Sequence, residues 1–123
     1  MTAPHFDLVS HWRLQAPVER VWAALARPEG WPLWWPGLRA VQTLRPGQPD
    51  GVGRICRLEW RTGLVYPLCI DVEALEVLRP ERLRGRASGM LRGEGIWLLR
   101  GHGAVTDVTY VWRVDLSQRW MRW

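Results

Sequence analysis

The stretch LVSHWRLQAPVERVWAALAR, residues 8–27, changes from a strand pattern to a helix pattern at Ala16-Pro17. Before this point, apolar and polar side chains alternate as they do in a strand. Pro17 suits the first turn of a helix, and Glu19 adds a favourable negative charge there. Helical spacing then follows in Val18, Val21, Trp22 and Leu25. The stretch therefore predicts a strand over residues 8–15 and a helix over residues 17–27.

Downstream of this helix, the pattern predicts one short helix and then only strands. The segment GWPLWWPG, residues 30–37, is bounded by Pro and Gly and holds one or two helical turns at most. Six strands joined by short turns follow, over residues 38–45, 52–61, 66–78, 83–90, 91–100 and 104–116. Sequential strands with short turns form an antiparallel meander. With 123 residues, the chain is expected to be a single α+β domain spanning 1–123.

The alternation within the strands assigns an apolar face that must be covered. Its expected members are Trp12, Leu58, Trp60, Leu68, Ile70, Val72, Trp97, Tyr110 and Trp112. Ten tryptophans are too many to hide completely in so short a chain, which favours a cavity or interface over a plain packed core. Small residues at Gly85, Ala87, Gly89, Gly93 and Gly95 either leave volume for such a cavity or permit sharp curvature of the sheet.

Charge and hydropathy restrict the classes of partner. The net charge is +5, and all 17 basic residues are Arg, scattered singly rather than in a basic run, which argues against nucleic-acid binding. No apolar run approaches the ~20 residues that span a bilayer, and the N-terminus lacks a secretory pattern. We therefore expect a cytoplasmic protein with no membrane insertion.

Metal ions and cofactors are not expected. His5, His11 and His102 lack metal-ligand spacing, and phosphate-binding loops and dinucleotide fingerprints are missing. Strand parity points Cys56 inward and Cys69 outward, which argues against a disulfide between them.

A few polar residues are candidates for binding or chemistry. Arg54 and Arg86 could pair with a carboxylate or phosphate if they face a cavity, whereas an outward arginine would simply be solvated. Arg86 and Tyr110 are the candidate catalytic residues, because both could polarise a carbonyl group. The tryptophans of residues 31–35 could form either the mouth of a pocket or a hydrophobic plug against the sheet.

Several motifs occur together in a familiar order. They are the strand ending at Ala16-Pro17 with Val18–Trp22, then Pro28–Pro32, Trp34–Gly37, Gly51–Arg54, Leu78–Leu83, Gly93–Trp97 and Thr106–Trp112. Over residues 8–114 the chain resembles the START-like (SRPBCC) superfamily, in particular its polyketide cyclase/dehydrase and lipid transport branch. The resemblance implies a helix-grip fold, in which a curved antiparallel sheet grips a long C-terminal helix around a cavity. It also implies binding or transport of hydrophobic molecules, with aromatase or cyclase activity in some members.

The resemblance departs from the family at the C-terminus. The sequence ends at SQRWMRW, residues 117–123, about where the long helix would begin. The concave face would then lie open, which is unusual for a monomer. We expect self-association into a homo-oligomer through this face, with Trp120 and Trp123 near the contact.

These observations support three functional hypotheses. The first is binding of a small hydrophobic ligand that is aromatic, polyketide-like or lipid-like. Its expected ligand-binding residues are Trp12, Trp31, Trp34, Trp35, Leu58, Trp60, Ile70, Trp97, Tyr110 and Trp112. The alternatives are an enzyme of the polyketide cyclase, aromatase or dehydrase type and a protein-interaction module that uses an exposed apolar sheet face.

Overall fold

A computed structural model describes residues 5–61 and 67–116. Strand β1 (His5–Leu14) is followed by helix α1 (Val18–Leu25) and by the short 3-10 helix η1 (Pro28–Leu33). Six further strands complete the described chain: β2 (Leu38–Arg45), β3 (Ile55–Trp60), β4 (Leu68–Leu78), β5 (Arg82–Gly89), β6 (Leu91–His102) and β7 (Val105–Leu116). The predicted order of elements and the α+β class are confirmed.

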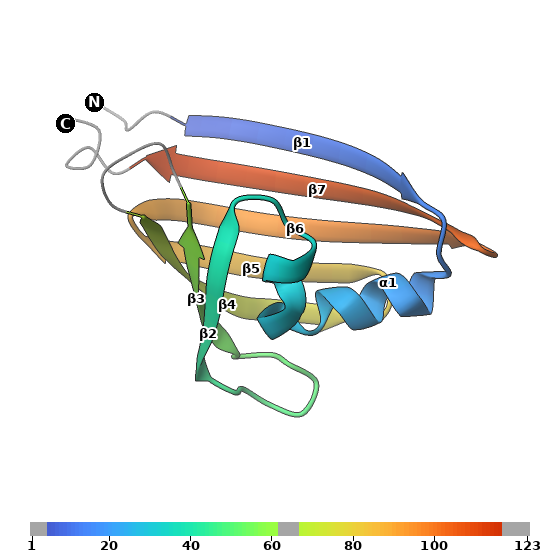
Figure 1. Ribbon diagram of the computed structural model, residues 1–123, viewed down its shortest axis with the longest axis horizontal. Coiled ribbons are helices and arrows are strands. Elements are labelled where there is room, and N and C mark those ends of the chain that lie inside the picture. The colour runs from blue at the N-terminus through green and yellow to red at the C-terminus, as the bar shows by residue number, and fades with distance from the viewer. Residues whose placement is uncertain (1–4, 62–66, 117–123) are drawn as a thin grey trace.

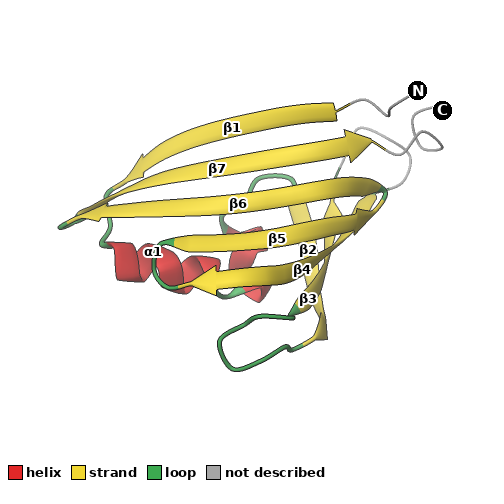
Figure 2. Ribbon diagram, turned by 180° about the vertical axis from the view of Figure 1, so that it is seen from behind, coloured by secondary structure: helices red, strands yellow, loops and turns green. Residues whose placement is uncertain are grey.

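All seven strands form one antiparallel sheet in the order β1-β7-β6-β5-β4-β3-β2. Strands β2 to β7 are a simple meander, and β1 pairs with β7 at the far edge. The sheet is strongly bent, so that β2 and β3 run across the direction of the longer strands (Figure 1). Helices α1 and η1 lie on one side of this bend, which is called the inner face below (Figures 1 and 2).

Strand parity places the apolar side chains as the sequence predicts. In the β3–β4 pair, Leu58 lies opposite Ile70 and Cys56 opposite Val72, and the polar pair Arg57 and Asp71 lies on the other face. A register shift between Ala74 and Glu76 then brings Val77 back to the inner side. The sequence marks this bulge, because its apolar parity changes there from Ile70, Val72 and Ala74 to Leu75 and Val77.

The element boundaries differ from the predictions mainly near glycine and proline. Strand β3 begins at Ile55, because Gly51 and Gly53 adopt positive φ angles of 97° and 85° in a turn that precedes it. Helix α1 ends at Leu25 rather than Arg27, and the second helix begins at Pro28 and ends at Leu33. Proline at the first position of η1 starts this new helix immediately after the first.

Two contacts fix α1 against the sheet. The Thr106 hydroxyl, fully buried in β7, donates a 2.7 Å hydrogen bond to the carbonyl of Ala16, just before the helix. At the other contact, Gly101 of β6 lies so close to Val18 that a Cβ atom on the glycine would be 2.8 Å from the Val18 Cβ. The absent side chain therefore allows the first turn of α1 to rest on the β6–β7 hairpin.

Strand β7 ends at Leu116, the last described residue, so the expected lack of a long C-terminal helix concerns residues outside the described ranges. Trp120 and Trp123, the residues expected near a contact between copies, lie outside the described ranges.

Replacing Gly101 with Ala should lower the free energy of unfolding by about 1–3 kcal/mol, because the new methyl group pushes Val18 and α1 away from the sheet. Chemical denaturation measures the change. Gly30→Ala is the matched control, since a Cβ at Gly30 meets nothing within 4 Å. Equal stabilities of the two variants would contradict the proposed close packing.

Candidate ligand cavity

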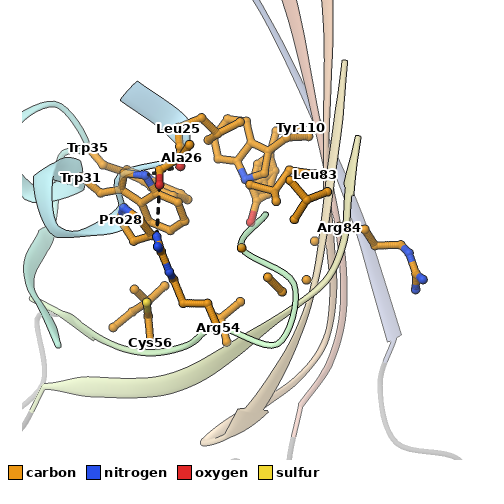
Figure 3. A pocket seen from close by; sticks show the side chains of 18 of the residues that line it. Leu25, Ala26, Pro28, Trp31, Trp35, Arg54, Cys56, Leu83, Arg84 and Tyr110 are labelled. Atoms are coloured by element: carbon orange, nitrogen blue, oxygen red, sulfur yellow. Dashed lines mark hydrogen bonds between the residues drawn. The ribbon is translucent and has the colours of Figure 1, made fainter. Parts of the chain in front are cut away.

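A cavity of about 790 Å³ lies between the inner face of the sheet and the two helices. Residues from every strand except β2 line it, together with residues of α1, η1 and the loop between β2 and β3. Its wall is mainly aromatic and aliphatic, and Figure 3 shows the helix-borne rings on one side and the sheet on the other. The bent sheet therefore encloses space rather than a fully packed core.

The structure brings together nearly all of the residues that the sequence predicts as ligand-binding. Those that line the cavity are Trp12, Trp31, Trp35, Leu58, Trp60, Ile70, Trp97, Tyr110 and Trp112. Trp34 does not line it and instead packs on the outer side of Trp35, with 44% of its surface exposed. Trp12, on the edge strand β1, is 46% exposed and stacks on Trp97 at 6.1 Å, so it lies at the open end.

Trp35 stands at the centre of an aromatic cluster. Its ring centroid lies 4.9 Å from that of Trp60 in β3, 5.5 Å from that of Trp97 in β6 and 5.8 Å from that of Tyr110 in β7. All three pairs have a T-shaped arrangement, which is favourable for aromatic rings. Trp35 packs as the predicted plug against the sheet and also lines the cavity, whereas a role of the segment 31–35 as the mouth of a pocket stays a prediction.

The glycines in β5 and β6 contribute in two different ways. Gly85 and Gly95 line the cavity, and a Cβ at Gly95 would lie 3.0 Å from both the Tyr110 hydroxyl and the Trp112 ring. Gly93 instead faces the backbone carbonyl of Arg113, which a side chain at that position would overlap. The glycine signal therefore reflects both room for aromatic rings and close approach of backbones in the bent sheet.

Arg54 is the cationic residue whose head group spans the cavity. Its Nη1 donates a 3.1 Å hydrogen bond to the carbonyl of Ala26 at the end of α1, as Figure 3 shows, and its Nε donates a 3.4 Å bond to the carbonyl of Pro46. Among the described residues, no carboxylate forms an ion pair with Arg54. The guanidinium therefore keeps unused N–H donors beside an apolar space.

The carboxylate of Glu29 is near enough to Arg54 for that positive charge to affect its pKa, although its hydrogen bond goes to another residue. Its Oε1 accepts a 2.8 Å hydrogen bond from the Thr43 hydroxyl, and this bond is the main reason why the pKa of Glu29 lies below its usual value. The charge of Arg54 contributes a smaller lowering. Glu29 therefore stays ionised at neutral pH without neutralising Arg54 directly.

Tyr110 and Trp60 are the other polar groups of interest in the wall. Burial raises the pKa of Tyr110 well above its usual value, so the phenol stays protonated, and its hydroxyl has no hydrogen-bond partner among the described residues. The indole N–H of Trp60 is buried and likewise lacks a partner in the described part of the chain. Both residues line the cavity, but the Trp60 N–H has almost no accessible surface, so only the Tyr110 hydroxyl is placed to meet a ligand without movement of the wall.

The arginines of β5 point away from the cavity. Arg86 is exposed and pairs with Glu73 at 3.2 Å, so this candidate catalytic residue does not line the site. Arg84 contributes only its stem, because its head group passes to the outer side and meets Glu94 at 2.9 Å (Figure 3). Parity explains both, since Leu83 and Gly85 occupy the inner positions of this strand.

Sequence reasoning missed several lining residues that the fold brings in. Trp22, Leu25 and Pro28 come from α1 and η1, and Val77 and Leu83 come from β4 and β5. The helical spacing of Trp22 and Leu25 was a usable signal, because the apolar stripe of the helix must face the sheet. The position of Val77 depends on the bulge, whose signal is the change of apolar parity from Ala74 to Leu75.

The comparisons with known proteins agree with this architecture. The family model described as "Polyketide cyclase / dehydrase and lipid transport" matches residues 6–123. The chain belongs to this family. No curated protein sequence matches it. Among the described residues, no helix is long and apolar enough to cross a membrane.

Solved structures of the START/SRPBCC fold superimpose well on the chain. The Zhui aromatase/cyclase from Streptomyces sp. R1128 has a TM-score of 0.77 at 18% identity, covering 93% of this chain and 70% of its own. A START superfamily protein from Mycobacterium smegmatis has a TM-score of 0.79 at 14% identity, covering 93% and 79%. Norcoclaurine synthase from Thalictrum flavum, in complex with dopamine and hydroxybenzaldehyde, has a TM-score of 0.70 at 11% identity, covering 98% and 75%. At these identities the likeness establishes the fold alone.

The two cysteines differ in environment, as strand parity predicts. Cys56 is buried in the cavity wall and Cys69 lies on the other face of the sheet, and both are free thiols. Burial is the main cause that raises the pKa of Cys56, so little of it is the reactive thiolate near neutral pH.

A thiol-reactive disulfide reagent at pH 8 should therefore modify Cys69 first and Cys56 about tenfold or more slowly, because only the thiolate attacks and Cys56 is shielded. Absorbance of the released product measures both phases, and the protein in denaturant should give two equivalents at once. Cys56→Ser should remove the slow phase. A single fast phase of two equivalents in the native protein would contradict this assignment.

Proposed function

We propose that this chain binds a small hydrophobic molecule, aromatic, polyketide-like or lipid-like, in the tryptophan-lined cavity. The observation that supports this proposal most strongly is the 790 Å³ space itself, which is within the size range of small-molecule sites. A fully packed core would leave no void of this volume, because protein interiors are close-packed.

Apolar burial would supply most of the affinity. A ligand that buries about 300 Å² of apolar surface gains roughly 7 kcal/mol at ~25 cal/mol per Å². Part of that gain offsets the loss of translational freedom on binding. Indole rings such as those of Trp35 and Trp97 add favourable edge and face contacts to flat ligands.

Ala74→Phe should lower the affinity for a neutral apolar probe, N-phenyl-1-naphthylamine, by about tenfold or more, because the phenyl ring occupies space that the ligand needs. Ala74 lines the cavity from β4. Probe fluorescence and quenching of tryptophan emission both report binding. Arg86→Gln, on the outer side, is the control and should stay within twofold. Unchanged affinity in a folded Ala74→Phe variant would contradict binding in this cavity.

An enzyme of the cyclase, aromatase or dehydrase type is the second candidate. The unpartnered Tyr110 hydroxyl favours it, because a protonated phenol in an apolar cavity can donate a hydrogen bond to a ketone and polarise it. Such a cavity would also act by folding a flexible substrate into a reactive shape. Arg86 is exposed and paired with Glu73, so it is not placed to polarise a ketone in the cavity.

Self-association through the open face and a cytoplasmic location are also proposed. The exposed apolar residues at the open end, Leu8 and Trp12 of β1 and Leu33 and Trp34 beside η1, support contact with another surface. We expect sedimentation velocity at tens of micromolar to show a dimer or larger species. A single monomeric boundary at that concentration would contradict self-association and would also weaken the third hypothesis, an interaction module.

A further inference from the structure

We propose that the cavity selects a hydrophobic anion, an apolar molecule with a carboxylate that binds Arg54 while its body packs on the indoles. This inference rests on the proposed function and specifies the charge of the ligand.

Hydrogen-bond donors in the wall outnumber acceptors that could serve a ligand. Each indole has one N–H and cannot accept a hydrogen bond. Of the tryptophans that line the cavity, Trp31 donates to a described acceptor, the carbonyl of Leu25 at 3.1 Å, and no other one does so among the described residues. The N–H of Trp60 has almost no accessible surface, so it does not count among the donors that a ligand can reach.

Arg54 adds a full positive charge to this set. Two of its N–H groups are engaged by the carbonyls of Ala26 and Pro46, and a guanidinium has five. The carbonyl of Ala26 belongs to the C-terminal end of α1, so it holds the arginine in place without cancelling its charge. The remaining donors form a planar fork of the kind that carboxylates bind well.

Among the described residues, Asp50 is the one carboxylate that lines the cavity, and its hydrogen bond to the backbone leaves its charge in place. Asp50 lines the loop side, where its Oδ1 accepts the backbone N–H of Val52 at 2.9 Å. Glu29 accepts from Thr43 and does not line the cavity. Beside Arg54, at the end of α1, a cationic ligand would face a like charge and unpaired donors, and its charge would be desolvated without compensation there. An anion matches the wall, and an ammonium group does not.

The test compares ligands of nearly one shape and different charge on the intact chain. The probes are 2-naphthoate, 2-naphthamide and 2-naphthylmethylammonium, with decanoate as a lipid-like carboxylate. Competition with N-phenyl-1-naphthylamine at pH 7.5 gives each dissociation constant. We expect 2-naphthoate to bind about tenfold or more tightly than the ammonium, with the amide between them. If naphthoate binds more tightly than decanoate, the ligand is of the aromatic type, and the reverse order indicates a lipid-like ligand. Either order supports an anion site.

Arg54→Gln and Arg57→Gln separate a local effect from the overall charge of +5. Both variants lose one positive charge, but Arg57 lies on the outer face and pairs with Asp71 at 2.8 Å. Arg54→Gln should weaken naphthoate about tenfold and the amide less than threefold, whereas Arg57→Gln should change neither by more than twofold. The probe series on the unaltered chain remains decisive if Arg54→Gln fails to fold.

The outcomes distinguish this inference from the proposed function. Equal binding of all probes to the unaltered chain, or equal effects of the two arginine variants, would overturn the anion site and leave hydrophobic binding intact. Failure of every probe to bind would overturn both.

Discussion

The packing of Trp35 against three strands is the contact on which the rest of the structure depends. This indole touches Trp60 on one arm of the bent sheet and Trp97 and Tyr110 on the other. It therefore holds the helical segment across the bend and keeps the two arms apart. An antiparallel sheet with one apolar face must bury that face. Here a few large aromatic rings cover one end of the inner face, and the remaining space inside the bend is the cavity. The cavity is a consequence of covering a wide curved surface with two short helices.

The outer face follows from the same alternation that builds the cavity. In β3, β4 and β5 the outward positions are mainly polar, and cross-strand registers bring opposite charges together. Examples are Arg57 with Asp71, Arg86 with Glu73 and Arg84 with Glu94. These exposed pairs contribute little stability individually. They place these arginines next to carboxylates, so the excess positive charge is spread out instead of concentrated in one run.

Much of the fold could be read from the sequence because its signals are local. Alternation in β3 and β4 gave the correct inner residues, including Leu58 and Ile70, and the constant register gave the opposite orientations of Cys56 and Cys69. The family motifs supplied the topology, which local patterns alone leave open. What failed was local geometry: the bulge after Ala74, which only a change of apolar parity marks, the early end of α1 and the turn before β3. Trp34 and Trp35 show the same limit, because adjacent identical residues carry no signal for which one turns inward.

The sequence names Arg54 as a candidate for pairing with a carboxylate or phosphate, and Arg54 does line the cavity, but its place at the end of α1 could not be predicted. It precedes β3, so strand parity does not determine its direction, and the turn that carries it depends on Gly47, Gly51 and Gly53 at positive φ. A Cβ at Gly47 would lie 2.5 Å from the backbone nitrogen of Arg54, so the loop closes tightly only with glycine there. This closure carries the guanidinium to the end of α1, where the carbonyl of Ala26 and the negative end of the helix dipole favour a cation. Helix and loop thus stabilise a half-buried charge that no described carboxylate neutralises. A charge held in this way is available to a ligand, whereas one in a tight ion pair would first have to give up its partner.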